Sequence, residues 1–231
     1  MNPTNQLISD KDTLVARHSI IRGSDLPETA GRFSAGRLIV ITGPSGVGKG
    51  TVTGNIIQRV DNIAKSVSVT TRAIRDGEQE GVDYFFRSVE QFQSMVENGE
   101  FLESAQFAGH FYGTPEDWVE DKVAQGMDVI LEIEVQGARQ VREKCPNAVL
   151  VFLSPPNFEA LEERLKGRGK DTKEMIMVRL EKAREELACL DLFEYEVIND
   201  NLDEAVRNLE HIVYAERLRI RPSKQGGEPK V

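Results

Sequence analysis

The chain has 231 residues and a formal net charge of −9, from 29 basic and 38 acidic side chains. One α/β domain of this length can bury its own core, and 39% apolar with 29% charged residues is typical neither of a disordered chain nor of a membrane protein. The negative charge argues against broad binding to nucleic acid, which selects basic surfaces, but it leaves a local nucleotide site open.

The two ends of the chain differ in composition from its middle. Residues 1–36 scatter acidic and basic side chains among Ser, Thr, Gly and Pro, which predicts a flexible arm and no secretory signal. Residues 221–231 predict a frayed tail, so the folded domain is expected over 37–220. Cys145 and Cys189 show no metal-binding spacing, which favours two buried, reduced thiols and a cytoplasmic protein.

Short apolar runs alternate with helical patterns between these ends. The predicted strands are 37–42, 67–71, 84–86, 101–107, 128–135, 148–153 and 194–200, and the predicted helices are 51–60, 88–98, one beginning at Pro115, 157–166, 173–189 and 202–219. Strands separated by helices predict an α/β fold with a parallel sheet and helices on both faces. The strand-rich stretch 66–113 predicts an insertion with a small sheet of its own.

A glycine-rich loop follows the first predicted strand. It comprises Gly43, Pro44, Ser45, Gly46, Val47, Gly48, Lys49, Gly50 and Thr51. The spacing G-x4-G-K is that of a P-loop, whose backbone N–H groups and following helix N-terminus bind phosphates. Lys49 adds a full charge for the β- and γ-phosphates. Gly50 stands where a Ser or Thr would bind Mg²⁺, so the metal is expected to be held mainly by the nucleotide and water.

A string of further motifs follows the loop in a fixed order. These are VSVTTRAIRDGEQEGVDYFF, FLESAQFAGHFYGT, VILEIEVQGA, RLKGRGKD and VIND, which together with GPSGVGKG span most of residues 37–219. The string resembles guanylate kinase. The resemblance implies a P-loop NTPase core, a GMP-binding insertion over 66–113, a helical lid over about 155–190, and Mg²⁺-dependent transfer of the γ-phosphoryl group of ATP to GMP, which gives ADP and GDP.

The resemblance also assigns the acceptor site. It places the GMP phosphate at Arg72, Arg75, Tyr84 and Tyr112, and the guanine at Glu103, Thr114 and Ser68. Forked guanidiniums suit a phosphate, and a carboxylate accepts from both donors on the guanine edge, which adenine lacks. Plainer interpretations stay open: Thr114 as a helix N-cap, the tyrosines as core, and the arginines as a solvated loop.

The remaining assignments concern the donor side. Together with Lys49 and Arg72, the lid arginines Arg164, Arg168 and Arg179 are the predicted catalytic residues, while Asn199 and Asp200 match positions near the adenine of ATP. The glycines between the lid helices predict a hinge that closes over the phosphates. A solvated charged helix pair is the plainer alternative. No base is needed, because a phosphate oxygen is already largely ionised above its second pKa of about 6.

Glu132 and Glu134 match the paired acids of the family, which are often Asp. Their i, i+2 spacing at the end of a predicted strand puts both on one face. Glu132 is assigned to GMP, and either residue is a candidate for contacting the metal through water. An ion pair with a nearby arginine is the alternative.

Two other functions stay open on the sequence. One is a kinase for AMP or a pyrimidine monophosphate, against which Glu103 argues. The other is a scaffold domain that has lost P-loop or lid residues and binds phosphopeptides, for which only Gly50 and the Glu132/Glu134 pair speak. Small-molecule substrates, no nucleic acid, no membrane, and a monomer or homodimer are expected.

Overall fold

The computed structural model describes residues 36–107, 109–167 and 172–220. The predicted arm and tail, and Arg168 of the lid, lie outside these residues. Gly36 is the exception at the N-terminal boundary, because its N–H donates to the Val123 carbonyl at 2.8 Å. Within the described ranges, no helix is both long and apolar enough to cross a membrane.

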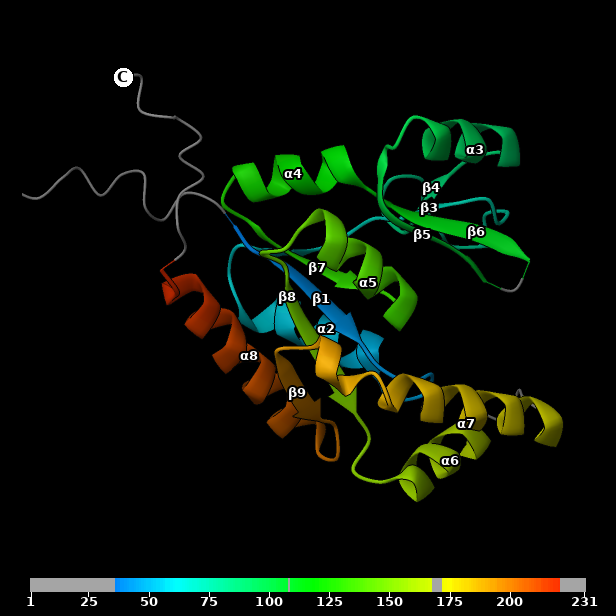
Figure 1. Cartoon of the computed structure of the whole chain (residues 1–231), viewed down its shortest axis with the longest axis vertical. Coiled ribbons are helices and arrows are strands. Elements are labelled where there is room, and N and C mark those ends of the chain that lie inside the picture. The colour runs from blue at the N-terminus through cyan, green and yellow to red at the C-terminus, as the bar shows by residue number, and fades with distance from the viewer. Residues whose placement is uncertain (1–35, 108, 168–171, 221–231) are drawn as a thin grey trace, which may run out of the picture. The chain divides into compact units, whose positions relative to one another are not determined.

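A five-stranded parallel sheet lies at the centre of the domain (Figure 1). Its strands, in spatial order, are β2 (Ile63–Lys65), β7 (Asp128–Glu132), β1 (Leu38–Thr42), β8 (Val149–Ser154) and β9 (Tyr195–Ile198). Since β1 pairs with β7 on one side and β8 on the other, the loop that follows β1 starts at the middle of the sheet's carboxyl edge. Ligands of open α/β sheets bind at this edge.

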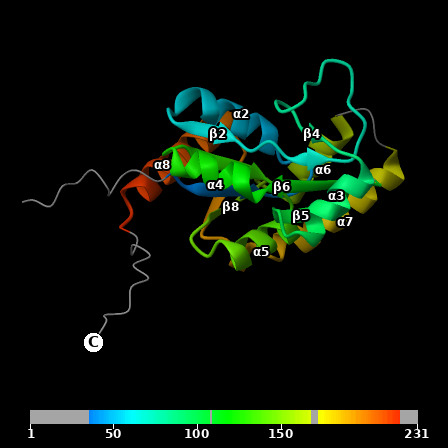
Figure 2. The same cartoon turned by 90° about the horizontal axis from the view of Figure 1, so that it is seen from above.

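Helices cover both faces of the sheet, with α2 and α5 on opposite sides in Figure 2. On one face, α2 (Lys49–Arg59) and α8 (Leu202–Leu218) share a core with Ile39 and Ile41. On the other face, α4 (Glu116–Ala124) and α5 (Val135–Lys144) share a core with Val40. Successive side chains of a strand point to opposite faces, so β1 supplies both cores. The predicted α/β fold is confirmed.

The predicted small sheet is also present. Its spatial order is β4 (Phe85–Phe86), β3 (Val69–Thr70), β6 (His110–Pro115) and β5 (Phe101–Phe107), and it carries α3 (Val89–Glu97). Val69, Phe92 and Phe101 form its separate core. A capping box starts α3: Ser88 Oγ accepts the Gln91 N–H at 3.2 Å, and Gln91 Oε1 accepts the Ser88 N–H at 2.9 Å.

Two helices form the predicted lid, toward the same end of the central sheet as the insertion (Figure 1). They are α6 (Phe158–Gly167) and α7 (Lys173–Leu187), and the short helix η3 (Leu190–Leu192) leads on to β9. Leu161, Leu165, Ile176 and Ala183 give the pair a core of its own. Thr172 caps α7 by accepting the Met175 N–H at 3.3 Å.

Four details differ from the sequence-based expectations. β2 and β6 were not predicted, because β2 has only three residues and β6 is interrupted by Gly113, which lies against the Phe101 ring. α4 begins after Pro115, so Thr114 belongs to β6. The strand predicted over 128–135 ends at Glu132, and it is followed by α5, a helix that the sequence patterns did not predict. Both cysteines are free, as expected, but only partly buried.

Candidate active site

The loop between β1 and α2 has the conformation that its glycines predict. Gly43, Gly46 and Gly48 all have positive φ. At Gly48 a Cβ would also approach Asn199 Nδ2 to 2.7 Å, so only glycine fits there. The Lys49 ammonium folds back onto the carbonyl of Gly43. The loop is therefore closed around its own lysine, with its N–H groups at the start of α2.

Three side chains from distant elements contact this loop. Asn199 at the end of β9 donates from Nδ2 to the Val47 carbonyl at 2.8 Å. Arg164 of α6 donates to the Val47 carbonyl at 3.5 Å and to the Asn199 carbonyl at 2.8 Å, and Arg179 of α7 donates to Ser45 Oγ at 3.2 Å. The structure thus brings two predicted lid arginines and Asn199 to the P-loop. Asp200 is exposed.

The inner face of α7 adds two charges that the sequence did not single out. Lys182 pairs with Glu134 at 2.6 Å, and its ammonium lies 5.9 Å from the Phe107 ring centroid. Glu186 is only 8% exposed. Burial lowers the pKa of Lys49, and Glu186 is the carboxylate that most opposes this. An Arg/Glu-rich helix does not reveal which of its charges face inward, so no sequence signal marked these two.

Glu132 and Glu134 do not form the predicted pair on one face. β7 ends at Glu132, and Glu134 is the N-cap of α5, so the strand periodicity stops between them. Glu132 Oε1 lies 3.2 Å from Lys65 Nζ, and its other oxygen would be 3.7 Å from a Cβ at Gly50. Their ion-pair partners are lysines, rather than the arginine considered as an alternative.

Glu103 and Thr114 form a buried pair across the insertion. They face each other in the β5–β6 register, and Thr114 Oγ1 donates to Glu103 Oε1 at 2.7 Å. Glu103 is 5% exposed, and burial raises its pKa, which the bonds from Thr114 partly offset. Thr114 is not a helix N-cap, because Pro115 occupies that position without a side-chain bond. Ser68 is half-buried just before β3.

Two residues of α5 hold this carboxylate in place. A Cβ at Gly137 would come within 2.8 Å of Glu103 Oε2, so the glycine makes room for it. Gln140 accepts from the Ser104 N–H at 3.1 Å and donates to the Ser104 carbonyl at 3.0 Å, which fastens α5 to β5. Gly137 carries one signal that could have marked it, because glycine is disfavoured inside a helix.

The predicted phosphate-binding side chains gather at the end of β3. The Arg72 guanidinium is buried, lies 5.3 Å from the Tyr84 ring centroid and forms two bonds to Glu78, at 2.7 and 3.0 Å. The Tyr84 and Tyr112 rings meet edge-on at 6.1 Å. The Glu78 carboxylate raises the pKa of Arg72. Arg75 is exposed, and its N–H donates to Glu78 at 2.9 Å.

The hydroxyls of the two threonines before Arg72 set the course of this segment. Thr70 Oγ1 donates to the Phe111 carbonyl at 3.1 Å and accepts the Arg72 N–H at 3.2 Å. Thr71 Oγ1 accepts the Phe111 N–H at 3.0 Å. Neither threonine was predicted to have a role, although both stand in the motif TTR.

The family model described as Guanylate kinase matches residues 35–216. The chain belongs to the guanylate kinase family. Guanylate kinase of Synechococcus sp. (strain JA-3-3Ab) is 54% identical over 179 residues, which cover 78% of this chain and 82% of that protein. Guanylate kinase of Streptococcus thermophilus (strain CNRZ 1066) is 50% identical over 186 residues, which cover 80% and 89%.

A solved structure of the family agrees with this assignment. Guanylate kinase from Anaplasma phagocytophilum superposes with a TM-score of 0.65 at 35% identity, over 80% of this chain and 88% of that one. The family resemblance seen in the motifs is therefore confirmed over residues 35–216.

Proposed function

We infer that this chain phosphorylates GMP to GDP with ATP as the phosphoryl donor. One observation in the molecule carries the choice of acceptor. A P-loop and the buried Glu103–Thr114 pair occur in one domain and are joined through α5. The N-cap of α5, Glu134, acts electrostatically on the P-loop lysine, and the helix presents Gly137 to Glu103.

Glu103 selects the base. Its carboxylate accepts from the N1–H and the 2-amino group of guanine, while the Thr114 hydroxyl orients it. Adenine has an acceptor at N1 and no 2-amino group, so AMP would leave a buried carboxylate unpaired. This disfavours a kinase for AMP, and the intact P-loop lysine and lid arginines disfavour a phosphopeptide scaffold.

The reacting phosphates meet between the P-loop and the arginine at the end of β3. Arg72, with the hydroxyls of Tyr84 and Tyr112, holds the GMP phosphate, and Arg75 completes the site from the loop. Lys49, Arg164 and Arg179 neutralise charge on the donor phosphates. An oxygen of the GMP phosphate forms the new bond to the γ-phosphorus as the bond to ADP breaks. Catalysis is alignment and charge neutralisation, without a base.

Mg²⁺ fits this site. Glu132 Oε2 faces the position of Gly50, so a carboxylate oxygen lies where the missing Ser or Thr side chain would point. Glu132 would contact the metal directly or through water, and Lys65 holds the other carboxylate oxygen. When bound, Mg²⁺ neutralises charge on the β- and γ-phosphate oxygens. The P-loop N–H groups orient the same phosphates.

The experiment that tests the proposal measures ADP release from Mg-ATP with GMP, AMP, UMP, dTMP or no acceptor. We expect fast release with GMP alone. Release with another monophosphate would discard the role of Glu103, and release without acceptor would indicate an ATPase. Tight GMP binding with no turnover would favour the scaffold. The substitution Glu103→Gln should weaken the binding of GMP far more than the binding of ATP.

A further inference from the structure

Three of the five N–H donors of the Arg72 guanidinium go to Glu78 and Ala73. Nη1 donates to Glu78 Oε2 at 3.0 Å, and Nη2 donates to Glu78 Oε1 at 2.7 Å. The second hydrogen of Nη1 serves the Ala73 carbonyl at 2.7 Å. The carboxylate therefore spans the Nη1–Nη2 edge in the bidentate manner that is favoured for arginine.

The two donors that neither Glu78 nor Ala73 takes form a fork of their own. They are the N–H of Nε and the second N–H of Nη2, which lie side by side on a rigid plane. Such a parallel pair matches two oxygens of a phosphate. The plane is fixed by rings, because Arg72 lies 5.3 Å from the Tyr84 centroid and 5.9 Å from the Phe86 centroid. The Tyr112 side chain, which the proposed function places at the phosphate, is hydrogen-bonded to the same guanidinium.

The same carboxylate closes the loop that carries both arginines. Glu78 Oε2 accepts the Arg75 N–H at 2.9 Å, and the Glu78 N–H donates to the Arg75 carbonyl at 3.1 Å. Ordering a loop before the ligand arrives removes part of the entropy that binding would otherwise lose. Arg72 also lowers the pKa of Glu78, so the carboxylate stays ionised at neutral pH and the arrangement persists.

We propose that Glu78 is a positioning residue, which binds one edge of Arg72 so that the other edge is presented to the phosphate of the acceptor nucleotide. This rests on the proposed function, which places the GMP phosphate at Arg72. Glu78 acts through the arginine and does not touch the nucleotide. Its effect should therefore be confined to ligands that carry the phosphate.

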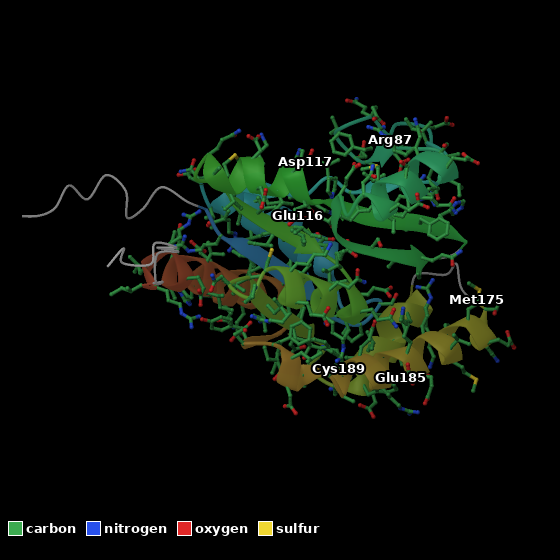
Figure 3. The ribbon with its side chains drawn as sticks, turned by 45° about the horizontal axis from the view of Figure 1, so that its top comes forward. Arg87, Glu116, Asp117, Met175, Glu185 and Cys189 are labelled. Carbon is green, nitrogen blue, oxygen red and sulfur yellow. The ribbon has the colours of Figure 1, made fainter. Side chains whose placement is uncertain are left out.

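The chain offers a matched control two residues away. Glu80 lies in the same loop, pairs with Arg87 at 2.7 Å and accepts the Phe86 N–H at 2.8 Å. Both glutamates thus join an arginine to a backbone N–H, but Arg87 has no part in the proposed site and lies on the insertion away from the lid helices (Figure 3). Glu80→Gln therefore disturbs the same loop in the same chemical way.

The test compares Glu78→Gln and Glu80→Gln in the full-length protein. The steady-state KM values for GMP and ATP are measured, together with the inhibition constant of guanosine, which has the base but no phosphate. We expect Glu78→Gln to raise the KM for GMP about tenfold, the loss of one well-made charge-assisted contact. We expect Glu78→Gln to leave the KM for ATP and the inhibition constant of guanosine within about twofold of the wild-type values. All three constants of Glu80→Gln should also stay within about twofold of wild type.

A double-mutant cycle with Arg72→Ala tests the route of the effect. Without the guanidinium, Glu78→Gln should cause no further loss in GMP affinity, whereas a residue that only stabilises the loop would still cause one. An unchanged KM for GMP would overturn the positioning role, as would equal losses for GMP and guanosine. Tighter GMP binding would overturn it too, because Glu78 would then compete with the phosphate.

Failure of this inference is distinguishable from failure of the proposed function. If the wild-type protein turns over GMP and Glu78→Gln matches it, only the positioning role is refuted. If the wild-type protein neither binds nor phosphorylates GMP, the proposed function fails. Far-ultraviolet circular dichroism and a thermal melt of each variant identify one that has not folded, in which case the cycle is run with Glu78→Asp.

Discussion

Glu103 is a carboxylate in a site that provides little to stabilise its charge. It is 5% exposed, and Thr114 supplies the bonds that oppose the effect of burial on its pKa. The guanine edge brings two N–H donors to this oxygen pair. In the proposed complex the guanine donors therefore favour the ionised form of Glu103, whereas without ligand this carboxylate has few hydrogen-bond donors. GMP binding should for this reason depend on pH and on the space that Gly137 leaves for the carboxylate.

The first prediction concerns protons. Guanine donors favour the ionised carboxylate, so GMP should bind with release of a proton from Glu103 when the pH is near its raised pKa, and the KM for GMP should rise as the pH falls through that value. Calorimetry in buffers of different ionisation enthalpy measures the release. Glu103→Gln should abolish it; release that persists in this variant would assign the proton elsewhere.

The same shift has a defined sign for stability. Between the ordinary pKa of a glutamate and the raised pKa of Glu103, the folded chain binds more protons than the unfolded chain. The contribution of Glu103 to the free energy of unfolding therefore falls as the pH rises through this window. Buried Glu186, whose pKa is also raised, acts in the same direction.

The second prediction concerns Gly137. Alanine there would place a Cβ 2.8 Å from Glu103 Oε2 and displace the carboxylate. We expect kcat/KM for GMP to fall by the equivalent of about 1–3 kcal/mol, the usual range for overpacking, with the KM for ATP unchanged. Gly54→Ala is the matched control. It lies in α2 with no atom within 4 Å of the new methyl, so it should raise the melting temperature and leave kinetics alone.

At the scale of elements, α7 connects the three parts of the site. Arg179 reaches the P-loop, while Lys182 reaches both Glu134 at the start of α5 and the Phe107 ring in β5. Residues three or four positions apart share one helix face, so these contacts come from a single stripe. The Lys182–Glu134 side chains are about half exposed, 46% and 45%. Such a pair contributes at most about 1 kcal/mol, which suits a lid that must open.

The third prediction tests this contact. Lys182→Ala should increase amide hydrogen exchange along α7 in the ligand-free protein, since the helix loses its bond to α5, while the global free energy of unfolding changes by less than about 1 kcal/mol. Lys166→Ala is the control, because Lys166 pairs with Glu162 within α6 alone. Equal exchange in α7 for both variants would show that Lys182 does not hold the lid.

Most elements could be predicted because their sequences carry strong local signals. β1 and β8 are buried apolar runs, and the box at Ser88 marks the start of α3. The start of α5 was not predicted. The alternation that indicates a strand continues through Glu134, but Glu134 is the N-cap of α5. Tertiary packing, rather than local pattern, decides that boundary.

The candidate site also contains residues that the sequence could predict and residues that it could not. Motif residues such as Lys49, Arg72 and Glu103 could be placed by resemblance. The side chains around them could not be placed from the sequence. Gln140 and Lys182 contact partners that are distant along the chain, and Glu78 is one of several charged residues in its loop. Sequence patterns rank residue types, whereas these roles depend on which atoms face each other.

At the scale of the whole molecule, the proposed substrates lie against parts that have separate cores. The insertion is built on Val69, Phe92 and Phe101, and the lid on Leu161 and Leu165, apart from the cores on either face of the central sheet. Parts with separate cores can move as units. Under the proposed function, closure of both parts would exclude water, which otherwise would accept the phosphoryl group.

The fourth prediction follows from this division. GMP at a hundred times its Kd should stabilise the protein by about 2.7 kcal/mol by mass action, and Mg-ADP at a hundred times its own Kd should do the same. If the insertion and the lid close together, both ligands should stabilise the protein by more than the sum of their separate effects. Each ligand then loses less free energy in ordering a molecule that the other has already closed. Thermal melts with each ligand and with both measure the difference.

Lys49→Ala provides the control that separates closure from simple occupancy. This variant should lose turnover and most of the stabilisation by Mg-ADP, since the phosphates lose their only P-loop side-chain charge, while the shift caused by GMP alone remains. The excess stabilisation with both ligands should then vanish. A purely additive shift in the wild-type protein would mean that the insertion and the lid close independently, and that alignment of the phosphates rests on the P-loop and Arg72 alone.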